Sequence, residues 1–287
     1  MSRLKLLVCF LVMSAGNLLA SSALAAVIFA SVIGSDGTGD GSFTFPFRTL
    51  QHAYAQAQIG DTVKLVEPGD YGPATIDKAI TIIGTPGAGI FDPGGNAITV
   101  NAGPQDTVTI DNLIIDQGTG TGNGIQVNKV HKLNLYDVSI RTGSGPASAV
   151  SFRPNTNAEF YVDRLTTEGF APIIAEGWGL KLTPRDGAHV TGVLNRVFAR
   201  NNMNGIVSAP VGSSMVDVTF LNSIFSNTEF AVTSKGAGSN LYLGDTSITG
   251  NERGLRRQNG GNIFSVQNNR LFGNTANGSF SGVINVQ

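Results

Sequence analysis

The sequence predicts an all-β protein built as a single solenoid, because one short pattern recurs along most of the chain. In each copy two apolar residues alternate with polar ones, which is the periodicity of a β-strand, and a further polar residue follows. Those polar residues are spaced by 25, 27, 32, 26, 23 and 23 positions: Asn112, Asp137, Arg164, Arg196, Asn222, Asp245 and Asn268. Two or three short strands fit into such a repeat and a crossover helix does not, so each repeat describes one rung of a parallel β-helix of about nine rungs.

Asparagine and aspartate are expected to recur because each rung must turn. Both residues tolerate the left-handed backbone conformation, and side chains stacked in successive rungs can hydrogen-bond along the axis. A second series of this kind consists of Asn202, Asn227, Asn251 and Asn274. We therefore expect the repeated polar residues, Asn222 and Asp245 among them, to be partly buried and to serve the scaffold.

A short strand that begins with glycine or alanine recurs once per repeat. The copies cover residues 124–127, 149–152, 179–182, 205–208, 231–234 and 254–257. A small residue is needed where the chain bends tightly into a sheet. We expect these segments to form one sheet, with their second and fourth residues pointing into the core and the alternate residues pointing outward.

An export signal is expected at residues 1–25. Arg3 and Lys5 form the charged start, residues 6–13 are an apolar run, and Ala23-Leu-Ala25 is a small-x-small cleavage motif. The apolar run is too short to span a membrane. The mature chain, residues 26–287, is therefore predicted to be exported without a membrane span, as a secreted, periplasmic or cell-surface protein.

Residues 26–60 are predicted to cap the solenoid, and residues 61–287 are predicted to form its rungs. Leu50, Ala53, Tyr54 and Ala57 have the spacing of one amphipathic helix. A β-helix exposes the unpaired edge of its first rung, and such an edge needs cover. We expect the helix to provide that cover.

Composition and motifs exclude several classes of function. The net charge is −1 and only 14% of residues are charged, so the sequence indicates no basic surface for nucleic acid. No Cys and His residues are spaced as zinc ligands, and no metal site is assigned. Calcium is the one cofactor left open, at Asp36 and Asp40 in a Gly-rich segment, with a plain turn as the alternative.

The chain from about Asp61 to Asn274 resembles the right-handed parallel β-helix family of pectate-lyase-like proteins. The repeat carries this resemblance, together with the order of Gly/Asp turn, Pro46-Phe-Arg-Thr-Leu50, helix and Gly60-Asp-Thr-Val63. The resemblance implies a right-handed solenoid whose outward-facing short strands form a groove for carbohydrate. Lyases of this family use an Arg or Lys base beside a cation that holds a uronate carboxylate, whereas the hydrolases use several Asp residues.

No carboxylate occupies the outward positions of the short strands: Gln126, Asn128, Ser151, Arg153, Lys181, Thr183, Val207, Ala209, Thr233, Lys235, Arg256 and Gln258. This argues against a hydrolase, which needs two carboxyl groups. Arg153 and Lys181 are expected on neighbouring rungs, about 5 Å apart. An insertion at 170–178 adds Glu176 and Trp178, and Asp186 follows the same strand.

These residues suggest a site for an acidic sugar. In a lyase Lys181 would be the base, Arg153 the carboxylate clamp, Trp178 the stacking platform, and Glu176 or Asp186 an orienting acid. The sequence thus predicts an exported protein that binds a polysaccharide or cell-surface glycan, with a uronate-specific polysaccharide lyase as the enzymatic form. The alternative is a non-catalytic surface or matrix protein that uses the solenoid as a rigid binding rod.

Overall fold

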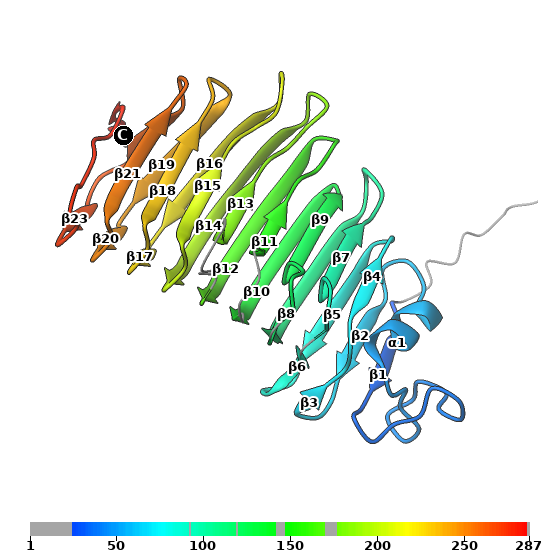
Figure 1. The fold of residues 1–287 in the computed structure, drawn as a ribbon. Coiled ribbons are helices and arrows are strands. Elements are labelled where there is room, and N and C mark those ends of the chain that lie inside the picture. The colour runs from blue at the N-terminus through cyan, green and yellow to red at the C-terminus, as the bar shows by residue number, and fades with distance from the viewer. Residues whose placement is uncertain (1–24, 92, 119, 142–146, 170–176, 286–287) are drawn as a thin grey trace, which may run out of the picture.

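Two sheets of parallel strands wind along one axis and enclose the apolar core (Figure 1). The computed structural model describes residues 25–91, 93–118, 120–141, 147–169 and 177–285. The predicted parallel β-helix is confirmed, but it has about seven turns and not nine. The prediction was too high because the described chain after Gln258 adds no further strand to the smaller sheet, so the last repeat is incomplete.

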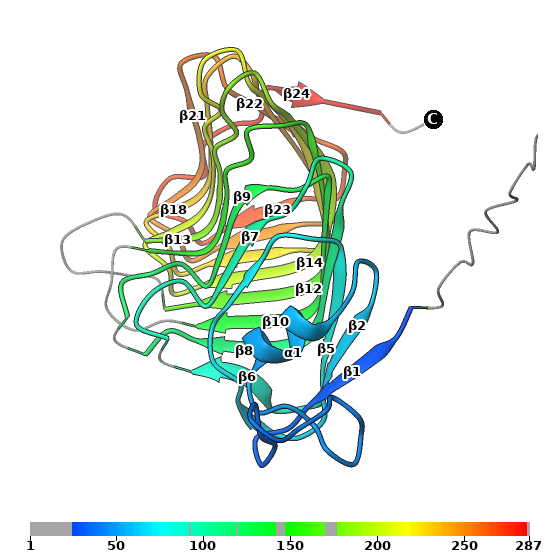
Figure 2. The ribbon, with the colours of Figure 1, turned by 90° about the vertical axis from the view of Figure 1, so that its right-hand side faces the viewer.

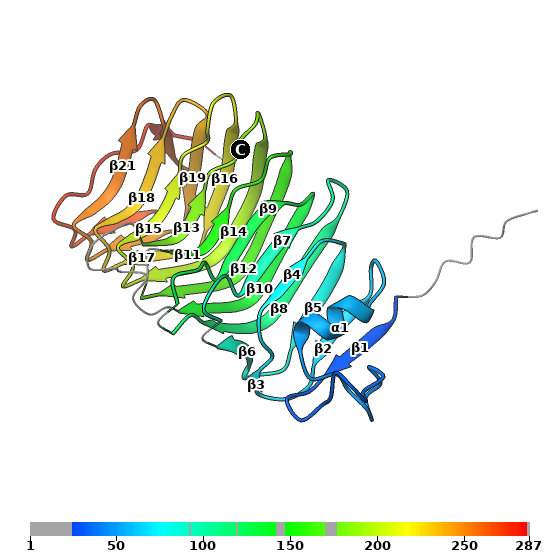
Figure 3. The same ribbon diagram turned by 45° about the vertical axis from the view of Figure 1, so that its right-hand side comes forward.

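The smaller sheet, sheet B, contains the predicted short strands and has eight members that lie side by side along the axis (Figure 3). They are β4 (Ala74–Ile76), β7 (Ile98–Asn101), β9 (Ile125–Lys129), β11 (Ser148–Phe152), β13 (Trp178–Leu182), β15 (Asn204–Ser208), β18 (Phe230–Lys235) and β21 (Arg253–Gln258). The second and fourth residues of each predicted segment were expected in the core. They are buried in every strand from β9 onward, except for Arg257. Arg257 is exposed because β21 is the terminal strand of sheet B.

The larger sheet, sheet A, has 16 strands. Its main path is β1 (Val27–Ala30), β2 (Thr62–Leu65), β5 (Ile80–Gly84), β8 (Thr107–Asp116), β10 (Lys132–Arg141), β12 (Ala158–Glu168), β14 (His189–Arg200), β16 (Met215–Leu221), β19 (Ser239–Gly244), β22 (Asn262–Ser265) and β24 (Gly282–Val283). Short strands continue it at one margin: β3 (Gly69–Asp70), β6 (Ala88–Phe91), β17 (Ile224–Ser226), β20 (Ser247–Thr249) and β23 (Arg270–Phe272).

Left-handed residues bend sheet A around the core. The seven repeated polar residues have φ between 48° and 64°, as the turn prediction requires: Asn112, Asp137, Arg164, Arg196, Asn222, Asp245 and Asn268. Between β10 and β12 the pairing stops at Tyr136 and Asp163, omits Asp137 and Arg164, and resumes one residue later. Sheet A therefore covers two sides of the solenoid and sheet B the third, as the view along the axis shows (Figure 2).

The expected burial of Asn222 and Asp245 is wrong, since both side chains are exposed. The left-handed turn points the following residue inward, and Ser223 and Thr246 are buried. The Thr246 backbone N–H donates to Asn269 Oδ1 at 3.0 Å, one rung further along. The left-handed residue therefore makes the turn. Hydrogen bonds between rungs come both from its successor and from the left-handed residue itself, as from Asn222 Nδ2 to Asn195 Oδ1 at 2.9 Å.

A second corner contains the predicted amide ladder in buried form. Asn251 is 2% exposed, and its Oδ1 accepts hydrogen bonds from the Thr228 backbone N–H at 3.0 Å and hydroxyl at 2.8 Å. Its Nδ2 donates to Asn274 Oδ1 at 2.8 Å. Asn227, predicted to belong to the ladder, is instead the left-handed residue that precedes Thr228. The polar ladder thus replaces apolar packing at this corner without leaving its amides unsatisfied.

The N-terminal end is closed by a strand and a helix together. Helix α1 (Leu50–Gln56) begins at Thr49, whose hydroxyl accepts from the His52 backbone N–H at 3.2 Å. Strand β1 pairs with β2 and covers the edge of sheet A, a role that we had predicted for the helix. The helix instead packs against β1, β2 and β4 and covers the end of the core.

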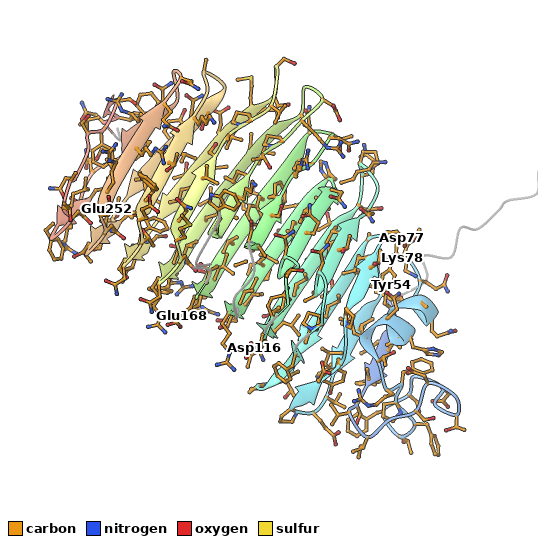
Figure 4. The ribbon with its side chains drawn as sticks, viewed as in Figure 1. Tyr54, Asp77, Lys78, Asp116, Glu168 and Glu252 are labelled. Carbon is orange, nitrogen blue, oxygen red and sulfur yellow. The ribbon has the colours of Figure 1, made fainter. Side chains whose placement is uncertain are left out.

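Three side chains fasten the helix to the first turn of the solenoid, where Figure 4 labels them. The Tyr54 hydroxyl donates to Asp77 Oδ1 and accepts from the Asp77 backbone N–H. Burial and the hydrogen bond to Asp77 raise the pKa of Tyr54 to about 12, so the phenol stays protonated and keeps donating. Lys78 Nζ donates to the Ala57 carbonyl at 2.6 Å and lies 4.5 Å from the Tyr54 ring centroid.

Candidate functional site

Small residues at the start of the sheet B strands shape its outer face. A Cβ added to Gly205 would lie 2.4 Å from the carbonyl oxygen of Ala231 on the next rung. The equivalent distance at Gly179 is 2.7 Å, to the Gly205 carbonyl, so the predicted need for small residues is confirmed. The tight bend leaves the preceding residues, Trp178 and Phe230, at the margin of the outer face, where both line a hollow.

Three predicted site residues share one surface hollow of about 450 Å³: Arg153, Trp178 and Lys181. Ser151 pairs with Lys181 in the register of β11 and β13, which places Arg153 and Lys181 on adjacent rungs, as predicted. A second hollow of about 380 Å³ shares Trp178 and Lys181 with the first and continues over β15, β18 and β21. The outer face of sheet B is therefore hollowed along most of its length, and Trp178 and Lys181 stand between the two hollows.

Lys181 lies directly over the indole of Trp178. Its Nζ is 3.8 Å from the ring centroid, which is the geometry of a cation–π contact. One face of the indole is thus occupied by the ammonium group. A sugar that stacks on Trp178 must use the other face or displace Lys181, so the two residues form one unit of the site.

Of the two predicted acidic residues, Asp186 alone lies among the described residues. Glu176 lies outside the described residues. Asp186 sits in an exposed turn after β13 with φ of 60°, and its carboxylate lies 3.8 Å from Arg185 NH1. It is not among the residues that line either hollow.

Sheet B carries positive charge only. Its eight strands, all within the described residues, contain no Asp or Glu but contain Lys129, Lys181, Lys235, Arg253, Arg256 and Arg257. The prediction that outward positions hold no carboxylate is therefore confirmed for the whole sheet. The described strands of this sheet therefore supply no pair of carboxyl groups of the kind that glycoside hydrolysis uses.

Two residues were overlooked as part of the site, Phe230 and Arg256. Arg256 Cζ lies 4.0 Å from the centroid of the Phe230 ring, a second cation over an aromatic residue on the same face. The sequence contained the signal: Phe230 precedes the small residue Ala231, as Trp178 precedes Gly179. Because Trp178 ends the insertion, the position of the repeat that it shares with Phe230 was not predicted.

The acidic residues proposed for calcium accept hydrogen bonds from protein groups, Asp36 from the segment before the helix and Asp40 within a turn. Asp36 Oδ1 accepts from the Arg48 and Thr49 backbone N–H groups at 2.7 and 3.0 Å, and Oδ2 accepts from the Thr49 hydroxyl at 2.7 Å. These bonds lower the pKa of Asp36 although partial burial opposes them. Asp40 Oδ1 accepts from the Ser42 backbone N–H at 2.9 Å. Across the described ranges, no three His, Cys, Asp or Glu side chains gather as metal ligands.

Comparison with known proteins places the fold but not the site. No protein-family model matches the sequence, and no curated protein does. A solved rhamnogalacturonan lyase has a TM-score of 0.53 and 12% identity over 85% of this chain and 76% of the lyase chain. A GH136 lacto-N-biosidase from Eubacterium ramulus has a TM-score of 0.47 and 10% identity over 90% of this chain and 66% of that one. At such identities the similarity shows the fold alone.

A search of the described residues for a helix long and apolar enough to cross a membrane finds none.

Proposed function

We propose that this protein is exported and binds an acidic polysaccharide along the outer face of sheet B. The observation that carries the proposal is the hollowed surface on which Arg153, Lys181 and Trp178 meet, over described strands that contain no Asp or Glu. Guanidinium and ammonium groups bind carboxylates through charge-assisted hydrogen bonds, and an aromatic ring packs on the apolar face of a sugar. The solved protein of similar fold, a rhamnogalacturonan lyase, supports carbohydrate as the class of ligand.

The catalytic form of the proposal is β-elimination from a uronate. The proton on the carbon beside the uronate carboxylate passes to Lys181 Nζ, and its electron pair forms a double bond to the neighbouring carbon. The glycosidic oxygen leaves from that carbon and takes up a proton from water. Arg153 holds the carboxylate, on which negative charge builds during proton removal. Lys181 must be uncharged to accept the proton.

The non-catalytic alternative uses the same surface. Sheet A and sheet B are joined by buried ladders such as Asn251–Asn274, which favours a stiff rod. In this form the protein binds the glycan and does not cleave it. The two alternatives therefore share Arg153 and Trp178 and differ only in whether Lys181 turns over the bound chain.

One experiment separates them. The purified protein is incubated with acidic polysaccharides, and binding is followed together with absorbance from the unsaturated uronate that elimination creates. A lyase gives both signals, and Lys181→Ala removes the absorbance while the circular dichroism spectrum stays unchanged. A rod gives binding without absorbance. Trp178→Ala weakens binding in either case.

Sheet A offers matched controls for both variants. Lys132 Nζ lies 4.3 Å from the Tyr161 ring centroid, the same kind of contact on the other face. Lys132→Ala and Tyr161→Ala should leave binding and turnover unchanged. If they impair binding as much as Lys181→Ala and Trp178→Ala, or if no acidic polysaccharide binds, the proposed function is wrong.

A further inference from the structure

The cations on the outer face of sheet B fall into two pairs along the axis. One row of outward side chains, fixed by the strand register, runs Ser151, Lys181, Val207, Thr233 and Arg256. The next row runs from Arg153 through Thr183 and Ala209 to Lys235, which pairs with Gln258. Arg153 and Lys181 thus belong to the rungs of β11 and β13, and Lys235 and Arg256 to the rungs of β18 and β21.

A neutral rung separates the pairs. Strand β15 contributes Val207 and Ala209 at the two outward positions, and both line the hollow between the pairs. Lys181 and Arg256 are therefore three strand spacings apart, as are Arg153 and Lys235. With adjacent strands 4.7–4.9 Å apart, the two pairs lie about 14 Å from each other along the axis.

The two pairs are built alike. Lys181 lies over Trp178 at 3.8 Å, and Arg256 lies over Phe230 at 4.0 Å. Trp178, Asn204 and Phe230 occupy one register position on successive rungs, so the aromatic residues form the same wall of the hollow. Each pair thus combines two cations with one aromatic ring, which repeats one binding arrangement along the solenoid.

A buried hydroxyl lies in the row between Lys181 and Arg256. Thr233 is 5% exposed and lines the hollow, and in the described part of the chain its Oγ1 has no hydrogen-bond partner. A buried polar atom without a partner costs about 1–3 kcal/mol, so a ligand that hydrogen-bonds it would recover that loss. The acids nearest in sequence, Glu229 and Glu252, do not line this hollow. Among the described residues that line this hollow there is no Asp or Glu, so the hollow offers a hydrogen-bonding group beside the cations.

We infer that the ligand is an extended polyanionic glycan that lies along the axis and places acidic groups at both cation pairs at once. The inference rests on the proposed function and specifies it: the chain must span about 14 Å and carry charges near both ends of that span. Single-stranded nucleic acid is the other extended polyanion. It needs open aromatic faces for its bases, whereas Lys181 and Arg256 cover the rings here, and the net charge of −1 is not that of a nucleic-acid-binding protein.

Calorimetric titration with oligogalacturonates of increasing length tests the inference. Oligomers shorter than about 14 Å should bind two per protein chain, one at each cation pair. Oligomers that span both pairs should bind one per chain and at least about tenfold more tightly, because the second contact becomes intramolecular. In the Lys235→Gln/Arg256→Gln variant the rise in affinity with oligomer length should disappear. Short oligomers should then bind one per protein chain.

The outcomes that overturn the inference differ from failure of the proposed function. One short oligomer per wild-type chain, or an affinity that does not rise with length, shows a single subsite and overturns the inference while acidic-glycan binding stands. Single-stranded DNA that binds as tightly as the long oligomer also overturns it. If no galacturonate binds, the proposed function fails as well. The Lys132→Ala variant on sheet A should reproduce the wild-type titration.

Discussion

Lys132 on sheet A and Lys181 on sheet B make the same contact in sheets whose strands differ in charge. Each ammonium lies over an aromatic ring, at 4.3 Å from the Tyr161 centroid and 3.8 Å from the Trp178 centroid. Lys132 also pairs with Glu159 at 3.0 Å, and that bond raises the pKa of Lys132. Lys181 stands in a sheet whose strands contain no acidic residue. The same contact between an ammonium group and an aromatic ring thus belongs to the scaffold on sheet A and to the candidate site on sheet B.

Other cations of sheet A are also paired with acidic residues. At one margin, the register of β8, β10, β12 and β14 alternates acids and bases: Asp116, Arg141, Glu168 and Arg200. Arg141 pairs with Asp116 at 2.9 Å and Arg200 with Glu168 at 3.0 Å. Figure 4 shows Asp116 and Glu168 along this edge. Charges of opposite sign on neighbouring strands stabilise a sheet modestly, so these sheet A cations are matched by acids of the scaffold.

Removing charge from each face in turn gives the largest expected effect. Arg153→Gln/Lys181→Gln should weaken binding of an acidic polysaccharide by about a hundredfold, since each charge-assisted contact contributes about 1.5 kcal/mol. The matched variant Arg164→Gln/Arg196→Gln removes two sheet A cations that pair with Asp137 and Asp163. It should leave binding unchanged. Equal losses of affinity would show that the two faces do not differ in function.

At the corners that join the two sheets, substitution of a buried residue should reduce the stability of the fold far more than substitution of an exposed one. Asn251→Leu removes a buried amide that bonds Thr228 and Asn274, and it should lower the free energy of unfolding by about 3 kcal/mol. Asn222→Leu should cost about 1 kcal/mol, because the exposed Asn222 contributes mainly its left-handed backbone. Chemical denaturation measures both. A larger loss for Asn222→Leu would reverse our assignment of turn and ladder residues.

Acid should weaken sheet A before it changes sheet B. The hydrogen bond from Arg196 lowers the pKa of Asp163, and that from Arg164 lowers the pKa of Asp137. Carboxylates with a lowered folded-state pKa stabilise the protein above their unfolded value, about 3.9, and that contribution disappears as pH falls through the folded value.

The urea midpoint of the wild type should therefore fall more steeply below about pH 4 than that of Asp163→Asn. Asp245→Asn, a change at an exposed turn, serves as the control and should follow the wild type. Parallel curves for wild type and Asp163→Asn would contradict the role given to this ion pair.

A single ion pair at the margin of sheet A should matter least. Arg141→Gln breaks the contact with Asp116. The Arg141 side chain is 60% exposed and that of Asp116 is 34% exposed. Exposed pairs typically contribute less than about 1 kcal/mol, so the melting temperature should change little and binding should not change. A large loss of stability here would mean that the charge ladder acts cooperatively and supports the solenoid more than its exposure suggests.

The sequence predicted what depends on local repetition. The period of the polar residues identified the fold and the left-handed turns, and the alternation within strands placed Arg153 and Lys181 on neighbouring rungs. Burial of Asn222 was predicted wrongly because periodicity cannot tell a turn residue from its neighbour when both are polar. Strand β1 was missed because it occurs once, outside the repeat. Phe230 under Arg256 depends on contact between rungs, which spacing along the chain does not reveal.

The proposed function requires that the outer face of sheet B recognise acidic groups on a glycan. The most direct measurement compares polygalacturonate with its fully methyl-esterified form, which keeps the sugar backbone and removes the charge. The wild-type protein should bind the acidic polymer, more weakly as salt increases, and should not bind the ester measurably. Equal binding of both polymers, or binding that salt does not weaken, would contradict the claim.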